Sequence, residues 1–193
     1  CDGCGYAANA ERAESARPDP PGSDDAAGAV ELVATPGVHT IEDLCRPPYG
    51  IPAERQIKTL VHVVGSRPMV FLLRGDHTLN EAKLAGVAGT TQFRPADAEE
   101  IFAVLGAHPG SLGAVGVRNV PVFADLCLEG TSGMTTGANR DGYHLRHVDI
   151  GRDIQVTRWV DLRRVTAGER CARCGVTSDR SRTPASAPTV GGS

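Results

Sequence analysis

Two Cys-x-x-Cys pairs lie at opposite ends of this 193-residue chain, and each pair is followed directly by a glycine. The first pair is Cys1 and Cys4, and the second is Cys171 and Cys174. Because a Cys-x-x-Cys turn presents two thiolates to one metal ion, two such pairs complete a tetrahedral sulfur site. The spacing predicts that the two ends of the chain meet at one structural zinc ion. The segment between them then leaves and returns to one point, as an insertion in a larger protein does.

The other cysteines and the first residue add further expectations. Four paired cysteines in a chain of this length are typical of zinc in a reducing compartment, so we expect a cytoplasmic protein. Cys45 and Cys127 stand outside the pairs, and we expect both to be buried free thiols. Since the chain begins with Cys1 rather than methionine, we expect it to be a fragment of something larger.

Composition places the chain among ordinary globular proteins with one core. Hydrophobic residues make up 40% of it and its formal net charge is −3. Any contact with nucleic acid must therefore come from a local patch rather than from the summed charge. No apolar run approaches the roughly 20 residues that a membrane helix needs. We expect neither a membrane nor DNA as a partner.

The hydrophobic pattern predicts short helices and strands that intermingle without a regular βαβ rhythm, which favours a mixed α+β fold. Expected helices cover 7–16, 41–44, 52–58, 81–87 and 98–105, the last with Ile101, Phe102 and Leu105 on one stripe. Expected strands cover 60–64, 69–73, 120–124 and 143–148, with a further one at Phe93 and with 156–165 packing back on the sheet. Residues 109–116 and 135–142 are expected glycine-bearing loops, 18–28 a solvated linker, and 176–193 a disordered tail.

Five features are candidates for chemistry, and each also has an ordinary structural interpretation. They are Lys58, the loop that starts at Gly110, Asp125, the loop 135–142, and His144. A lysine suits contact with a phosphate but is usually a solvated surface charge, and glycine clusters that can cradle an anion are usually turns. An acid at a strand end often caps a loop, and a lone histidine is more often structural than catalytic.

Several catalytic motifs are missing from the sequence. No Gly-Lys-Ser/Thr follows the glycine loop, which excludes a Walker-type phosphate loop, and neither Gly-x-Ser-x-Gly nor HExxH occurs. His144 and His147 are three residues apart, so on a strand they would face opposite sides. A hydrolytic zinc site built from histidines is therefore not expected.

Several segments in their order along the chain carry a more specific signal than any single residue. The longest are RGDHTLNEAKL at 74–84 and GANRDGYH at 137–144, and CDGCGYAANAE opens the chain. Together with TPGVHTIEDLC, IPAERQIKTLVHVV and VPVFAD, they resemble the insertion (editing) domain of bacterial-type prolyl-tRNA synthetase. The resemblance covers about residues 1–175.

The resemblance implies a fold and a division of the chain. The fold would be α+β, with a mixed, strongly curved sheet and flanking helices, as in YbaK-like deacylases. The expected parts are a neck segment with a linker at 1–29, the editing domain at 30–166, a second neck segment at 167–175, and the disordered tail at 176–193. No region is long enough to hold the catalytic domain that activates proline, so we expect no ATP binding by this chain alone.

The activity that the resemblance implies is hydrolysis of alanine wrongly esterified to the proline tRNA. A pocket shaped for proline cannot exclude the smaller alanine, because a missing methylene gives only about 1–3 kcal/mol of discrimination, so a second site must remove the product. The expected partners are the acceptor end of the proline tRNA and the catalytic domain of the parent synthetase. Zinc would be structural, and catalysis would need no cofactor.

Family roles carry over to particular residues. Lys58 would contact the acceptor end, Asp125 would be an acid of the pocket, and His144 would define the alanine pocket. Gly110 starts the loop that the family writes as Gly-x-x-x-Pro, which here reads GSLGA, so that alanine replaces the proline that would fix φ. The expected substrate-binding residues in the two loops are Gly113, Ala114, Gly137 and Asn139.

The chemistry expected of this site is attack by water. The amides of the Gly110 loop would polarise the ester carbonyl, and the ribose hydroxyl of the substrate would assist. Two other interpretations remain open. One is an inactive relative that holds the tRNA or a partner synthetase without hydrolysis, and the other is a zinc-ribbon interaction protein in which the cysteine pairs are the function.

Overall fold

The computed structural model describes residues 1–9, 11–18 and 28–177. The chain divides into two compact units, one of Arg17–Arg164 and one that joins Cys1–Ala16 to Val165–Ser193. The domain boundaries expected from the sequence stay a prediction. Most of the expected linker, and the expected tail from 178 onward, lie outside the described residues. Within the described ranges, no helix is long and apolar enough to cross a membrane.

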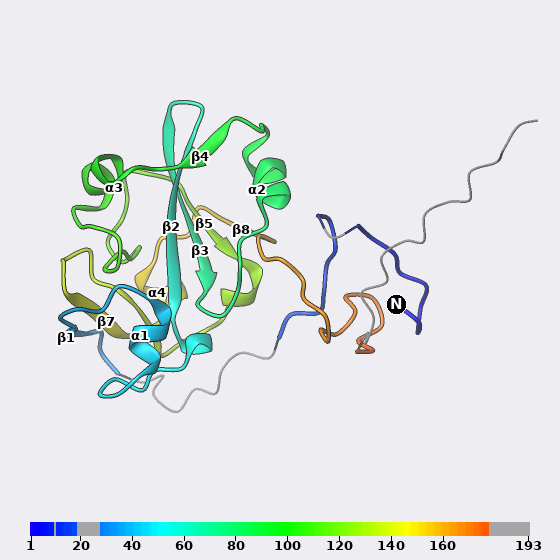
Figure 1. The fold of residues 1–193 in the computed structure, drawn as a ribbon, viewed down its shortest axis with the longest axis horizontal. Coiled ribbons are helices and arrows are strands. Elements are labelled where there is room, and N and C mark those ends of the chain that lie inside the picture. The colour runs from blue at the N-terminus through cyan, green and yellow to red at the C-terminus, as the bar shows by residue number, and fades with distance from the viewer. Residues whose placement is uncertain (10, 19–27, 178–193) are drawn as a thin grey trace, which may run out of the picture. The chain divides into compact units, whose positions relative to one another are not determined.

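Strands and short helices alternate along the larger unit (Figure 1). The strands are β1 (Glu31–Ala34), β2 (Ile57–Val64), β3 (Arg67–Arg74), β4 (Phe93–Pro95), β5 (Val122–Asp125), β6 (Met134–Gly137), β7 (Tyr143–Val148) and β8 (Arg158–Val160). The helices are α1 (Ile41–Cys45), α2 (Glu81–Ala88), α3 (Ala98–Leu105) and α4 (Ile150–Asp153), with 3₁₀ turns η1 (Ala53–Arg55) and η2 (Leu126–Leu128).

The strands form two sheets, and the expected mixed α+β class is confirmed. Five strands are arranged in the order β4-β2-β3-β5-β8, in which β4, β2 and β3 are antiparallel and β3, β5 and β8 are parallel. Three strands form an antiparallel sheet in the order β1-β7-β6. An isolated bridge between Gln56 and Thr135 joins the start of β2 to β6.

The five-stranded sheet has an apolar core on each face, because successive side chains of a strand point to opposite sides. Ile57 and Val61 of β2 belong to one core, which also takes in residues of α3, α4, β6 and β7. Phe71 and Leu73 of β3 belong to the other, which α2 covers through Leu84. The sheet therefore carries helices on both sides, as Figure 1 shows.

Capping residues explain where three of the five predicted helices begin. Thr40 and Asp43 form a capping box at α1, and Asp97 and Glu100 form one at α3, while the side chain of Asn80 caps α2. The predictions of these helices are confirmed within one residue at their ends.

The apolar stripe predicted for α3 is only partly correct. Ile101 and Leu105 are buried, but Phe102 is 49% exposed. The hairpin of β2 and β3 matches its prediction closely, with Gly65 at φ 61° in the connecting turn.

Four local predictions are wrong, and long-range pairing explains most of them. The helix expected at 52–58 is only η1, because Ile57 already enters β2. The described part of 7–16 is not helical: the carbonyl of Asn9 accepts hydrogen bonds within a turn, and Ser15 bridges to Cys171. The loop expected from residue 135 begins as β6 instead. Cys45 is exposed, although Cys127 is buried as expected.

Candidate functional site

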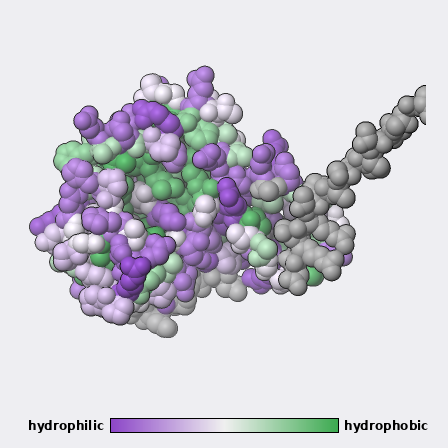
Figure 2. Space-filling model, viewed as in Figure 1, coloured by the Kyte–Doolittle hydropathy of each residue, from purple (hydrophilic) through white to green (hydrophobic). Residues whose placement is uncertain are grey.

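A pocket of about 490 Å³ lies along the outer edge of β2, which is the edge that faces away from β3. Its walls come from residues 39–44 around the start of α1, from β2, from α3, from the loop 109–112, and from β6 and β7. Apolar lining residues include Ile41, Leu44, Val61, Ile101 and Leu112. Figure 2 shows apolar residues gathered over the middle of the face that β2 crosses, with hydrophilic residues around them. The pocket can hold a small apolar group beside a few polar ones.

His144 is the buried histidine of this pocket. It lies on β7 between Val33 of β1 and Gly137 of β6, and only 6% of its surface is exposed. The hydroxyl of Thr35 lies 2.6 Å from its Nδ1 atom, which leaves Nε2 as the ring nitrogen for the pocket. Burial lowers the pKa of the imidazole below its usual value of 6.5. His144 is therefore a neutral, oriented hydrogen-bonding group at neutral pH.

The loop that begins at Gly110 brings backbone amides to the pocket. Gly110 has φ +109°, and a Cβ added to it would lie 2.8 Å from Nδ1 of His39, so this position requires glycine. Within the residues that the structure describes, the N–H groups of Gly110 and Leu112 have no hydrogen-bond acceptor. Both residues line the pocket. Two such donors can stabilise negative charge that develops on a carbonyl oxygen.

The four predicted substrate-binding residues lie mainly behind the wall of the pocket. Asn139 accepts a hydrogen bond from the N–H of Gly113 at 2.8 Å and donates one to its carbonyl at 2.9 Å. Gly137 lines the pocket, whereas Gly113, Ala114 and Asn139 do not. Ala114 is fully buried in the core. The hydrogen bonds between Gly113 and Asn139 tie the glycine loop to the segment that follows β6.

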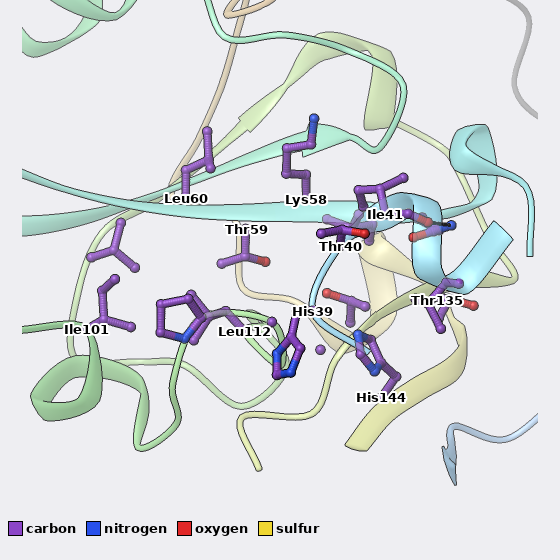
Figure 3. Close-up of a pocket in the computed structure, with 18 of the residues that line it drawn as sticks. His39, Thr40, Ile41, Lys58, Thr59, Leu60, Ile101, Leu112, Thr135 and His144 are labelled. Atoms are coloured by element: carbon purple, nitrogen blue, oxygen red, sulfur yellow. Dashed lines mark hydrogen bonds between the residues drawn. The ribbon is translucent and has the colours of Figure 1, made fainter. Parts of the chain in front are cut away.

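Lys58 has a different orientation from the one its predicted role requires. Figure 3 shows Lys58 and Leu60 on one side of β2 and Thr59 on the other, facing His39 and His144. The Nζ atom of Lys58 donates a hydrogen bond to the carbonyl of His77 at 2.9 Å. The strand of Lys58 lines the pocket, but its ammonium group in this structure points to the opposite face of the sheet.

Asp125 lies outside the lining of the pocket and is 1% exposed. Its Oδ1 atom accepts the N–H of Cys127, and its Oδ2 atom accepts the N–H groups of Leu162 and Arg163. The two bonds from Leu162 and Arg163 join the end of β5 to the chain that follows β8, and the bond from Cys127 caps η2. The structure thus brings Gly110, Gly137, His144 and the strand of Lys58 to one pocket, and it places Asp125 elsewhere.

A second group of possible metal ligands surrounds Asp125. Donor atoms of His77, Asp125 and Cys127 lie within 4.8 Å of one another. Burial, and after it the carboxylate of Asp125, raises the pKa of the Cys127 thiol to about 12. A protonated thiol is a poor ligand, and the carboxylate already accepts three backbone donors. This cluster is suited to hydrogen bonding rather than to metal binding.

Sequence reasoning missed several polar residues of the pocket. Buried oxygen atoms without a hydrogen-bond partner in the described chain are Oγ1 of Thr59, Oγ1 of Thr136 and Oε1 of Gln56, and all three residues line the pocket. Thr59 could have been found from the sequence, because alternation along a strand places it opposite Lys58. Thr136 and Gln56 have no comparable signal.

The four paired cysteines come together within the smaller unit. The Sγ atoms of Cys1 and Cys174 are 3.5 Å apart, and those of Cys4 and Cys171 are 3.7 Å apart. All four sulfur atoms lie within 4.8 Å of one another. Sulfur ligands at about 2.3 Å from a tetrahedral zinc ion are about 3.8 Å apart. The cluster therefore has the composition and size of a site that can hold a metal ion.

Comparison with known proteins identifies the larger unit. Residues 35–152 match the family model of the aminoacyl-tRNA editing domain. The chain belongs to this family. The match includes all the residues that line the pocket, and it begins at Thr35, whose hydroxyl orients His144. The family expected from the sequence is thereby confirmed.

Relatives and solved structures agree with this assignment. The chain is 48% identical over 184 residues to a proline–tRNA ligase of Anaeromyxobacter sp. strain Fw109-5, covering 93% of this chain and 32% of that protein. It is 42% identical over 175 residues to one of Desulfovibrio desulfuricans, covering 91% and 30%. It thus spans about a third of the length of these relatives.

One solved structure shows the same fold. A protein described as a candidate trans-editing enzyme for prolyl tRNA synthetase has a TM-score of 0.59 and 21% identity, covering 70% of this chain and 87% of that one. The expected fold is confirmed by this likeness.

Proposed function

We propose that this editing domain hydrolyses the ester bond of alanine wrongly attached to the proline tRNA. The observation that carries the proposal is the pocket itself, in which a neutral, oriented imidazole faces a glycine loop with free amide donors. The proline–tRNA ligases among the relatives support proline tRNA as the substrate. The acceptor end of this tRNA and the catalytic domain of a parent synthetase are the partners that we propose.

The reaction that we propose is attack by water on the ester carbonyl. The water oxygen bonds to the carbonyl carbon, the bond from that carbon to the ribose oxygen breaks, and the ribose oxygen takes the proton. The products are free alanine and a tRNA with its terminal hydroxyl restored. The amides of Gly110 and Leu112 would stabilise the developing oxyanion, and the neighbouring ribose hydroxyl would carry the proton.

Selection for alanine would follow from the size of the apolar part of the pocket. Ile41, Leu44 and Ile101 are apolar lining residues that, with His144, would have to limit the space beside the reacting ester to a methyl group. A pocket that refuses the correct amino acid by size, after a first site has admitted the smaller one, completes a double sieve.

Deacylation of the two charged tRNAs tests the proposal. The chain should hydrolyse Ala-tRNA of the proline isoacceptor well above the uncatalysed rate and leave Pro-tRNA intact. His144→Ala should relax this preference, and Gly110→Ala should lower the rate, because its Cβ would collide with His39. Lys58→Ala tests whether the lysine turns toward the tRNA when substrate binds. Equal rates for wild type and all three variants would remove the site assignment.

We further propose that the cysteine cluster binds one structural zinc ion. Four free thiols at tetrahedral spacing are the donor set that structural zinc prefers. When bound, zinc would supply a fixed crosslink between the two ends of the chain. The cysteines themselves bring the segments around Cys1 and Cys171 together, and Ser15 bridges to Cys171 beside them.

A further inference from the structure

The outer edge of β2 has a gap in its strand pairing, and Thr59 lies in that gap. Toward the C-terminal end of β2, β4 pairs with this edge from His62 onward, and the N–H of Ala96 donates to the carbonyl of Val61 at 2.9 Å. At the N-terminal end of β2, β6 reaches the same edge only through the bridge of Gln56 and Thr135. Among the described strands, none pairs with this edge at Thr59.

The register of the sheet shows which way the backbone of Thr59 points. In an antiparallel sheet, a residue directs its N–H and its carbonyl to the same neighbouring strand, and the next residue directs both to the strand on the opposite edge. The carbonyl of Val61 is directed to the β4 side, and Val63 faces Pro68 of β3, which has no N–H to donate. Thr59, two residues before Val61, therefore directs its N–H and its carbonyl to the outer edge, along which the pocket lies.

The side chain of Thr59 adds a hydroxyl oxygen to the same pocket. Figure 3 shows it on the side of β2 that faces His39 and His144. Its hydroxyl is buried and has no hydrogen-bond partner among the described residues. Such a group is costly to leave unpaired, so an unpartnered hydroxyl in a pocket marks a position where a bound group is expected. Thr59 thus offers the pocket two oxygen acceptors from one residue.

We propose that Thr59 binds the α-ammonium group of the aminoacyl ester, with its hydroxyl and its backbone carbonyl as acceptors. This inference rests on the proposed function. An ammonium group has three N–H donors and no acceptor, so it needs oxygen atoms rather than amides. The neutral imidazole of His144 adds no positive charge that would repel it. The amides of Gly110 and Leu112 then remain for the ester carbonyl.

Glu42 offers the competing explanation. Among the described residues that line the pocket, it is the one carboxylate, and it is exposed on α1. An ammonium group could pair with it by charge alone. We assign Thr59 instead, because the charge of an exposed carboxylate is screened by water and Thr59 supplies buried acceptors with fixed directions.

A substrate without the ammonium group separates these assignments. Lactyl-tRNA of the proline isoacceptor carries a hydroxyl where Ala-tRNA carries the ammonium group and is otherwise the same ester. With each rate divided by that of uncatalysed hydrolysis, wild type should favour Ala-tRNA over lactyl-tRNA about tenfold or more at limiting substrate, because hydrogen bonds to a charged group are worth at least that factor. Thr59→Val keeps the shape of the side chain and should lose most of this preference, while its rate on lactyl-tRNA stays within about twofold of wild type.

Matched variants make the result decisive. Thr131→Val removes another buried hydroxyl, one that donates to the carbonyl of Leu128 away from the pocket, and it should keep the preference. Thr59→Ser retains the hydroxyl and should also keep it. Glu42→Gln should leave the preference unchanged.

Each failure has a distinct meaning. Equal acceleration of both hydrolyses by wild type, an unchanged preference in Thr59→Val, or its loss in Glu42→Gln would overturn the role of Thr59 while the proposed function stands. Hydrolysis of neither ester by a folded wild-type chain would remove the proposed function, and this inference with it. If Thr59→Val does not fold, Glu42→Gln still tests the assignment, because its loss of the preference would give the ammonium group to Glu42.

Discussion

Gly113 and Gly137 lie back to back, with no room for a side chain on either. A Cβ on Gly113 would collide with the carbonyl oxygen of Gly137, and a Cβ on Gly137 would collide with the backbone of Ser111 and Leu112. We expect Gly113→Ala and Gly137→Ala each to destabilise the fold by about 1–3 kcal/mol, because one backbone must move away from the other. Both should also lower deacylation, since the loop that carries the Gly110 amide would shift. Thermal unfolding and Ala-tRNA hydrolysis measure the two effects.

Gly86 provides the matched control for these substitutions. It lies within α2, and a Cβ added there would meet nothing within 4 Å. Gly86→Ala should stabilise the protein by about 0.5–1 kcal/mol, because alanine favours the helix more than glycine does. If Gly113→Ala and Gly137→Ala left stability unchanged or raised it as Gly86→Ala does, the close contact of the two loops would be contradicted.

The hydrogen bond between Thr35 and His144 leads to a second prediction. Thr35→Val keeps the shape of the side chain but leaves Nδ1 of a buried imidazole without its partner. The free energy of unfolding should fall by about 1–3 kcal/mol, the cost of an unpaired buried polar group. Because the ring loses its fixed orientation, the preference for Ala-tRNA over Pro-tRNA should also fall. Competitive deacylation of the two substrates measures this.

Thr90 is the control for this prediction. Its hydroxyl accepts a hydrogen bond at the surface, from the N–H of Gln92. Thr90→Val should change stability by no more than about 0.5 kcal/mol and leave the preference as in wild type. If Thr35→Val behaved in the same way, the imidazole would be oriented by its packing and not by the hydroxyl.

Local signals in the sequence predicted the elements that local chemistry determines. The hairpin of β2 and β3 follows from two β-branched and apolar runs around a glycine turn. Helix α3 begins at the capping box of Asp97 and Glu100, whose residue types and spacing are visible in the sequence. Of the motifs that indicated the family, IPAERQIKTLVHVV includes β2, whereas RGDHTLNEAKL runs into α2 and GANRDGYH connects β6 to β7.

Elements and orientations that depend on long-range pairing could not be predicted in this way. Residues 134–137 are rich in threonine and glycine, which is typical of a loop, and they become β6 only because β7 pairs with them. Assigning 52–58 to a helix removed the strand alternation that would have placed Lys58 opposite Thr59. The three backbone donors of Asp125 include two from residues 37 and 38 positions later, which no local pattern reveals.

Buried histidines predict how stability depends on pH. Burial lowers the pKa values of His62, His77 and His144. In the unfolded chain these side chains take up protons as the pH falls through about 6.5, whereas in the folded chain they do so only at lower pH. The unfolded state therefore binds more protons below that pH, and the free energy of unfolding should decrease as the pH falls from about 6.5. Above about pH 7.5 these groups should contribute no slope.

Urea unfolding between pH 8 and pH 5.5 measures this slope. The window avoids carboxyl groups such as that of Glu100, whose pKa Arg94 lowers to about 2. His144→Gln should flatten the slope below pH 6.5, because it removes one of the histidines whose pKa burial lowers. A slope of the opposite sign would mean that the buried histidines are charged in the folded protein.

Metal content and its loss test the cysteine cluster. We expect one zinc ion per chain by elemental analysis of protein purified without added metal, because four thiolates at this spacing complete its coordination. Cys4→Ser and Cys171→Ser should each reduce the zinc content to well below one ion per chain. A strong chelator should release the zinc from the wild type and lower the temperature at which the protein begins to unfold. Cys45→Ser is the matched control, since Cys45 is exposed and lies outside the cluster. A wild-type chain that folds with free thiols and takes up no zinc would show that the four sulfur atoms meet without a metal ion.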